Sequence, residues 1–176
     1  MTTKITLSGE VASGKTTVGK LLAEKLNYEF ISLGTMVREK AKNEGLHILD
    51  FQKKCKENPA IDLEIDGDFS NLCNSKDRLI IDYRMGFKFV TDAFHAFLKI
   101  SEEDAVERLK SANRVNENHE TVKQRNDSFK SQFINSYQVD YTKESHYDLI
   151  VPINENRTAE EIADIIIIHL KKKITP

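Results

Sequence analysis

The sequence predicts an α/β fold in which one five-stranded parallel sheet carries helices on both faces. Three observations lead to this class. Short apolar runs alternate with amphipathic segments, the first run is followed at once by a glycine-rich loop, and 176 residues fit one domain with a single core. Parallel strands need crossover connections, and the helical segments supply them. Ligands are therefore expected at the carboxyl ends of the strands.

Each element is predicted from its local pattern. Apolar runs bounded by polar or turn residues predict strands at 4–8, 28–32, 78–82, 93–100 and 147–151. Apolar residues at helical spacing, with Ser101 and Thr158 as N-caps, predict the helices. These cover 18–26, 33–43, two or three pieces within 46–74, a helix after 101–104, most of 113–144, and 158–173.

Composition and charge restrict the possible partners. The net charge is -2 and basic residues are scattered among acids, which disfavours a nucleic-acid partner. The two cysteines, Cys55 and Cys73, form no C-x-x-C pair, so neither a zinc site nor a disulfide framework is predicted. The apolar run 165–168 is far shorter than the roughly 20 residues that span a bilayer, and residues 1–7 lack an export signal. We therefore expect a cytoplasmic monomer without a membrane partner.

The segment 9–17 matches the phosphate-binding pattern G-x-x-x-x-G-K-[ST]. Glycines allow the sharp turn that points backbone N–H groups at an anion, and the following helix presents its positive end there. A strand before and a helix after make a chance turn the weaker interpretation. Lys15 is expected to reach the terminal phosphates and Thr16 to hold Mg²⁺. The predicted ATP-binding residues are Gly9, Glu10, Val11, Ala12, Ser13, Gly14, Lys15, Thr16 and Thr17.

An acid and several arginines extend this site. Asp82 ends an apolar strand and is the expected second Mg²⁺ ligand, the alternative being a solvated strand-end acid. Transfer between two nucleotides brings several anions together, so it requires converging cations. Arg38 and Arg84 could bind an acceptor phosphate, and Arg114 and Arg125 could close over the transferring group as a lid. Singly, an arginine is more often a surface charge. The predicted catalytic residues are Lys15, Arg84, Arg114 and Arg125.

Five segments together resemble the nucleoside monophosphate kinase family, most closely the compact cytidylate kinases of archaea and some bacteria. The anchors are 9–17, 31–39, 61–66, 81–84 and 147–151. The resemblance implies a three-layer P-loop kinase fold. It also implies one kinase domain over 1–176, with an acceptor-binding helical insert at 34–75 and a lid insert at 111–140.

The implied activity is ATP- and Mg²⁺-dependent phosphorylation of CMP or dCMP, so the expected partners are small-molecule nucleotides. Adenine contacts are expected near 154–157. Competing interpretations stay open: Asp62 and Asp66 could form a solvated acidic helix face, and Ser32 could be a strand-end cap. By the resemblance, the acceptor-binding residues are Ser32, Arg38, Asp62, Asp66 and Arg84.

Three positions depart from the family pattern. Tyr83 replaces the usual glycine and could narrow the acceptor site, and Met85 replaces an acid that bacterial relatives carry. Gln132 stands near an expected lid arginine, with Lys130 as a weaker substitute. Two other functions remain open: another small-molecule P-loop kinase of the adenylate or shikimate type, or a catalytically weak nucleotide-binding relative. The segment 33–38 lacks the Asp-x-Asp of shikimate kinases, which favours a monophosphate acceptor.

Overall fold

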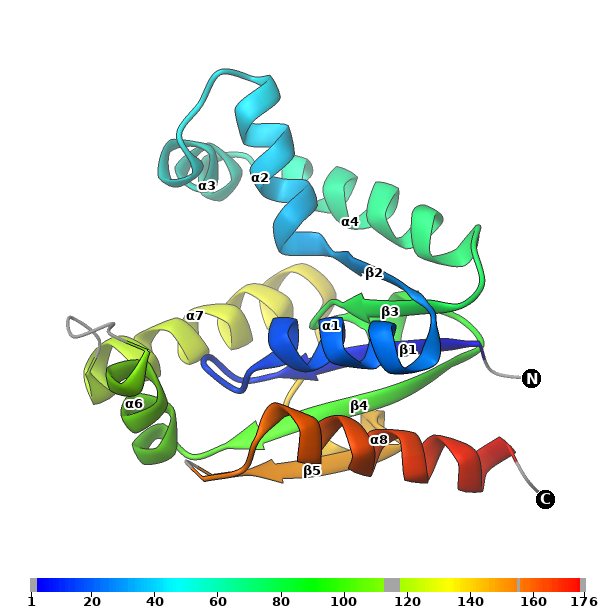
Figure 1. The fold of residues 1–176 in the computed structure, drawn as a ribbon. Helices are drawn as coiled ribbons and strands as arrows, with labels where there is room; N and C mark the ends of the chain where they lie inside the picture. The colour runs from blue at the N-terminus through cyan, green and yellow to red at the C-terminus, as the bar shows by residue number, and fades with distance from the viewer. Residues whose placement is uncertain (1–2, 113–117, 155, 175–176) are drawn as a thin grey trace.

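The computed structural model describes residues 3–112, 118–154 and 156–174. Its five strands form one sheet, and every neighbouring pair is parallel (Figure 1). The order across the sheet is β2-β3-β1-β4-β5, so β1 lies at the centre. This confirms the predicted fold class. The strands are β1 (Lys4–Gly9), β2 (Glu29–Ser32), β3 (Leu79–Asp82), β4 (Ala93–Ile100) and β5 (Leu149–Ile153).

Helices cover both faces of the sheet (Figure 1). Helices α1 (Lys15–Leu26) and α8 (Ala159–Ile174) pack side by side on one face, and α6 (Glu102–Ser111) joins their core. Helices α4 (Pro59–Asn74) and α7 (His119–Tyr137) pack on the other, beside the short α5 (Gly86–Phe89). Helices α2 (Leu33–Asn43) and α3 (Ile48–Glu57) form a separate small core with α4. A 3-10 turn, η1 (Glu144–His146), precedes β5.

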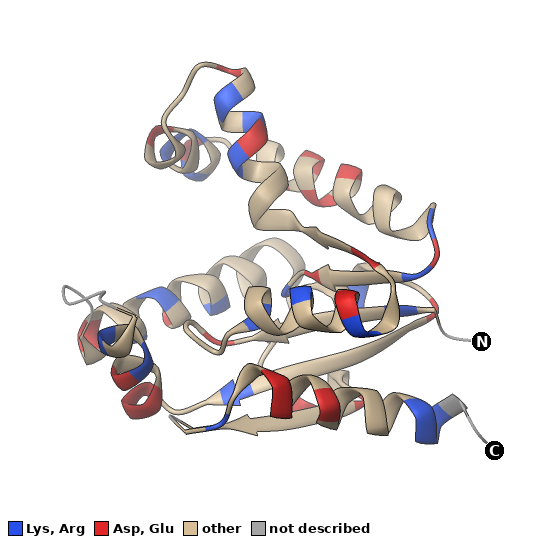
Figure 2. Ribbon diagram, in the orientation of Figure 1, with Lys and Arg blue, Asp and Glu red and all other residues tan. Residues whose placement is uncertain are grey.

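Alternation along the strands divides the core. Ile5 and Ile80 face the α1 and α8 layer, whereas Leu79 and Ile81 face the α4 and α7 layer. Figure 2 shows acids near the start of α8 and lysines at its end, the arrangement that stabilises the helix dipole. Among the residues that the structure describes, no helix is long and apolar enough to span a membrane.

Three local features differ from the sequence expectation. Strand β5 begins at Leu149 rather than 147, and Asp148 before it already pairs with His95: its N–H donates to the His95 carbonyl oxygen and its carboxylate accepts the His95 N–H. Helix α7 ends at Tyr137, where Gln138 adopts a left-handed φ of 55°. Helix α5 was not expected. Gly86 permits it, because an added Cβ would lie 2.6 Å from Cβ of Thr6 on β1.

Candidate functional site

The glycine-rich loop joins β1 to α1 at the carboxyl edge of the sheet. Gly9 and Gly14 have φ angles of 147° and 87°, a region that favours glycine. A Cβ on Gly9 would lie 2.5 Å from the carbonyl oxygen of Leu98, so β4 leaves no room for a side chain. Gly14 is the N-cap of α1 and has no side chain to cap it. The first N–H groups of the helix are therefore available to bind an anion.

Lys15 is buried and folded back over the loop. Its Nζ donates hydrogen bonds to the carbonyl oxygens of Gly9 at 3.0 Å and Glu10 at 2.8 Å, and to Ser13 Oγ at 3.2 Å. Burial lowers the pKa of Lys15 to about 7, and the charge of Arg84 acts in the same direction. A phosphate in the loop would give this ammonium group a stronger, anionic partner than the backbone carbonyls.

Thr16 and Asp82 meet at the carboxyl edge of the sheet. The Thr16 hydroxyl donates to Asp82 Oδ2 at 2.8 Å, across the gap between α1 and the end of β3. Magnesium prefers oxygen ligands and usually combines one or two carboxylates with waters and substrate phosphates. The described residues contain no cluster of three or more His, Cys, Asp or Glu side chains that would form an all-protein cage. The Thr16–Asp82 pair therefore fits Mg²⁺ held jointly with nucleotide phosphates.

Ser32 and Arg38 converge at the start of α2. A Cβ on Gly34 would lie 3.5 Å from Arg38 Nη1 and 3.6 Å from Ser32 Oγ, so both side chains border the same space. Ser32 is the N-cap residue of α2, yet its hydroxyl makes no capping hydrogen bond. Arg38 is exposed and donates to Thr35 Oγ1 at 3.0 Å. Both groups are thus placed to contact a ligand, and that role stays a prediction.

Arg84 follows the end of β3 and lies near Lys15. Its guanidinium group stacks 3.9 Å above the ring of Phe129 on α7, and burial lowers its pKa. The charge of Arg125, also on α7, contributes to lowering the pKa of both Lys15 and Arg84, so Arg125 lies near both groups. Arg114 falls outside the described residues. Three of the four predicted catalytic residues therefore lie in one neighbourhood.

The two acids predicted on α4 have different environments. Asp66 is only 9% exposed, and its carboxylate accepts hydrogen bonds from Tyr83 at 2.8 Å and from Tyr137. Burial raises the pKa of Asp66, whereas both hydroxyls oppose that rise. Asp62 is half-buried and accepts a hydrogen bond from Gln132 Nε2 of α7 at 3.1 Å. Asp66 thus fixes α4 to its surroundings, and acceptor contact by either acid remains a prediction.

The positions that depart from the family pattern are also explained locally. The Tyr83 ring packs edge-on against Phe69 of α4, at a centroid distance of 5.2 Å, rather than standing free in the site. Lys130, the possible substitute for a lid arginine, forms an ion pair with Asp140 at 2.9 Å. Gln132 donates its hydrogen bond to Asp62 of α4. Of these contacts, the Gln132–Asp62 hydrogen bond joins α7 to α4.

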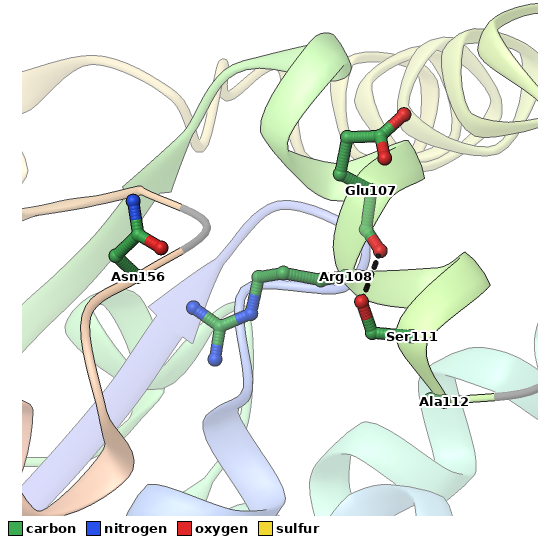
Figure 3. A pocket seen from close by; sticks show the side chains of 5 residues that line it. All are labelled: Glu107, Arg108, Ser111, Ala112 and Asn156. Atoms are coloured by element: carbon green, nitrogen blue, oxygen red, sulfur yellow. Dashed lines mark hydrogen bonds between the residues drawn. The ribbon is translucent and has the colours of Figure 1, made fainter.

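Sequence reasoning missed two side chains beside the loop. The Asn126 carboxamide oxygen on α7 accepts the Val11 N–H at 2.9 Å, so α7 contacts the loop directly. Arg108 on α6 lies next to Gly14, where an added Cβ would be 3.4 Å from Arg108 Nη2. It also borders a cavity of about 560 Å³ that faces the loop after β5 (Figure 3). The cavity is lined by Glu107, Arg108, Ser111, Ala112 and Asn156.

Fold and loop geometry define this chain as a protein of the P-loop kinase type. A family model described as an AAA domain matches residues 5–128. The cytidylate kinase of Sulfurisphaera tokodaii is 30% identical over 92% of this chain and 92% of its own length. A shikimate kinase from Acinetobacter baumannii in complex with shikimate has the same fold, with a TM-score of 0.69, 20% identity, and coverage of 98% of this chain and 95% of that one. The chain belongs to the compact P-loop kinase family that includes the archaeal cytidylate kinases.

A further relative is a longer protein. The S-adenosylmethionine-dependent nucleotide dehydratase of Lacinutrix mariniflava is 47% identical over 175 residues, which cover 98% of this chain but 37% of that protein. The chain thus spans little more than a third of that relative's length. In this relative a region similar to this chain forms part of a larger protein.

Proposed function

We propose that the chain transfers a phosphoryl group from ATP, with Mg²⁺, to a nucleoside monophosphate, most favourably CMP or dCMP. The observation that carries the proposal is the arrangement of Lys15 and the Thr16–Asp82 pair around the glycine-rich loop, with Arg84 and Arg125 beside it. The cytidylate kinases that match nearly the whole chain support the choice of acceptor.

Each group has a chemical task in this proposal. The loop N–H groups and Lys15 would bind the donor phosphates, and Mg²⁺ held by Thr16 and Asp82 would neutralise charge on them when bound. Arg84 would orient the acceptor phosphate, whose oxygen is already an anionic nucleophile and needs no general base. Arg125 on α7 would neutralise charge that develops on the transferring group. Closure of α7 would also exclude water and limit hydrolysis of ATP.

The cavity beside Arg108 supports a position for the donor base. It lies between the C-terminal part of α6 and the loop after β5, beside the phosphate-binding loop (Figure 3). The Arg108 guanidinium could stack on a purine ring, and Asn156 could hydrogen-bond to its edge. This location agrees with the expectation of adenine contacts near 154–157.

A coupled assay that follows ADP release tests the proposal. CMP, dCMP, UMP, AMP and shikimate are each offered with ATP and Mg²⁺, and the expected result is release that depends on CMP or dCMP. The matched control is the Lys15→Ala variant, which should lose that release. Release that depends on shikimate or AMP alone would assign a different acceptor. No acceptor-dependent release from the wild-type chain would overturn the kinase proposal.

The dehydratase relative supports a second proposal about the use of the product. We infer that the phosphorylated nucleotide supplies a nucleotide dehydratase reaction, because a similar region is joined to such a protein in Lacinutrix mariniflava. The test uses that dehydratase without its own kinase-like region, supplied with S-adenosylmethionine, CMP and ATP, with and without this chain. Dehydrated nucleotide is expected to accumulate faster when the chain is present. Equal rates in the presence of the chain and of its Lys15→Ala variant would contradict the link.

A further inference from the structure

Two buried polar atoms next to the glycine-rich loop have no hydrogen-bond partner. Among the described residues, they are the only buried side-chain nitrogen or oxygen atoms in this condition: Nε of Arg84 and the hydroxyl of Tyr141. Tyr141 is 0% exposed. Arg84 and Tyr141 influence each other's pKa through charge and through a direct side-chain interaction, so the two groups lie close together; the geometry leaves Arg84 Nε and the Tyr141 hydroxyl without a hydrogen bond. An unsatisfied buried donor is costly and rare in native proteins, so a neighbouring pair calls for a physical reason.

The backbones of both residues are held in place by one network. The Ser8 hydroxyl donates to the carbonyl oxygen of Arg84 at 2.9 Å. The Tyr147 hydroxyl lies 3.0 Å from Ser8 Oγ and also reaches the carbonyl oxygen of Tyr141. Packing fixes the side chains as well, since Tyr141 meets Phe133 edge-on at 5.4 Å and Arg84 stacks on Phe129. The unpartnered atoms are therefore positioned by their surroundings.

The two atoms share one chemical property: each carries a hydrogen that it can donate. Arginine Nε–H donates and never accepts, and burial raises the pKa of the Tyr141 hydroxyl, which keeps its proton at neutral pH. Two neighbouring buried donors match an anionic oxygen, which forms strong, charge-assisted hydrogen bonds. The pair lies at the carboxyl edge of the sheet, and the Arg84 charge is near enough to lower the pKa of Lys15.

We propose that Arg84 Nε–H and the Tyr141 hydroxyl together bind one oxygen of the acceptor monophosphate, which makes Tyr141 a further acceptor-binding residue. This inference rests on the proposed kinase function and names a group that recognises the phosphate rather than the base. An acceptor held by this pair would have its nucleophilic oxygen beside the donor phosphates bound by Lys15. The hydroxyl would add a directed hydrogen bond to the charge that Arg84 supplies.

The variant Tyr141→Phe tests the inference, since it removes the hydroxyl and keeps the ring. The matched control is Tyr28→Phe, because Tyr28 precedes β2 at the opposite, amino edge of the sheet. With ADP saturating the loop, CMP binding is measured by calorimetry and cytidine binding by NMR titration. Tyr141→Phe should weaken CMP binding about tenfold or more, the size expected for one hydrogen bond to a charged group, and leave cytidine binding unchanged. Its melting temperature should be unchanged or higher, because no paired hydroxyl is lost.

Several outcomes would overturn the inference. These are unchanged CMP affinity in Tyr141→Phe, an equal loss for CMP and cytidine, or a wild-type chain that binds CMP, UMP and AMP no more tightly than their nucleosides. A lowered melting temperature together with unchanged CMP affinity would indicate a structural hydroxyl. The proposed function fails separately if the wild-type chain binds CMP but shows no ADP release that depends on an acceptor. In that case the CMP and cytidine comparison still decides whether the pair binds phosphate.

Discussion

Replacing Tyr83 with phenylalanine removes one hydroxyl from the buried Asp66 carboxylate and leaves the ring packed against Phe69. Asp66 is 9% exposed, and its two oxygens accept from Tyr83 and Tyr137. The substitution therefore leaves one carboxylate oxygen without its buried donor. A hydrogen bond to a charged group contributes about 1.5–3 kcal/mol, so the free energy of unfolding should fall by about that amount. For a chain of this size the melting temperature should fall by about 3–12 °C.

The effect should also depend on pH. Burial raises the pKa of Asp66 and the Tyr83 hydroxyl opposes that rise, so the variant's carboxyl should have a still higher pKa. Above both native-state values Asp66 is ionised and the full loss applies. As the pH falls through them, native Asp66 gains a proton, and the lost bond becomes the weaker one to a neutral acid. The difference between wild type and variant should therefore be largest at alkaline pH and shrink on acidification.

Urea unfolding followed by far-UV circular dichroism measures this difference, since the chain has no tryptophan to report it. Curves are recorded at pH 8 and at steps down to the lowest pH at which the wild type stays folded. Tyr28→Phe serves as control and should change the free energy by less than about 0.5 kcal/mol. A loss below about 0.5 kcal/mol in Tyr83→Phe at pH 8, or a loss that stays constant with pH, would refute the reasoning.

Three further predictions concern the nucleotide site. ATP affinity measured by calorimetry should fall as pH rises through about 7, because Lys15 then loses its proton, and Lys15→Arg should remove that dependence. Asp82→Asn should raise the Mg²⁺ concentration for half-maximal ADP release about tenfold, while added Mg²⁺ restores the rate; an unchanged Mg²⁺ requirement would remove Asp82 from the metal site. Arg108→Ala should raise the KM for ATP several-fold and leave the KM for CMP unchanged in steady-state assays, whereas a rise for CMP alone would place the donor base elsewhere.

The phosphate-binding loop could be predicted from sequence because all of its parts are contiguous. Gly9 and Gly14 supply backbone conformations that few other residues tolerate, and the flanking strand and helix are readable from apolar spacing. Asp82 could be placed because the carboxyl ends of neighbouring parallel strands share one edge. The Thr16–Asp82 hydrogen bond shows that the two side chains meet, and Mg²⁺ binding by them stays a prediction.

Contacts between distant side chains could not be predicted in the same way. Asn126 and Val11 form a hydrogen bond although they are 115 residues apart in the sequence, and no local pattern predicts that contact. Asp62 and Asp66 are one turn apart on α4 and look equivalent in sequence. Only the hydroxyls of Tyr83 and Tyr137, which come from the end of β3 and from α7, make Asp66 the buried member. Whether a polar side chain is buried depends on tertiary packing, which local sequence patterns do not predict.

The hydrogen bonds of Asp66 constrain how this chain can change over evolutionary time. Replacing Tyr83 alone with glycine would remove both a buried ring and a hydroxyl, and would leave the buried Asp66 carboxylate without one of its two donors. Removing Asp66 alone would leave the buried Tyr83 hydroxyl and the half-buried Tyr137 hydroxyl without their acceptor. Viable substitutions at 66, 83 and 137 should therefore arise together. Among relatives, glycine at position 83 should occur together with an uncharged residue at position 66. Tyrosine at position 83 should occur together with an acidic residue at position 66.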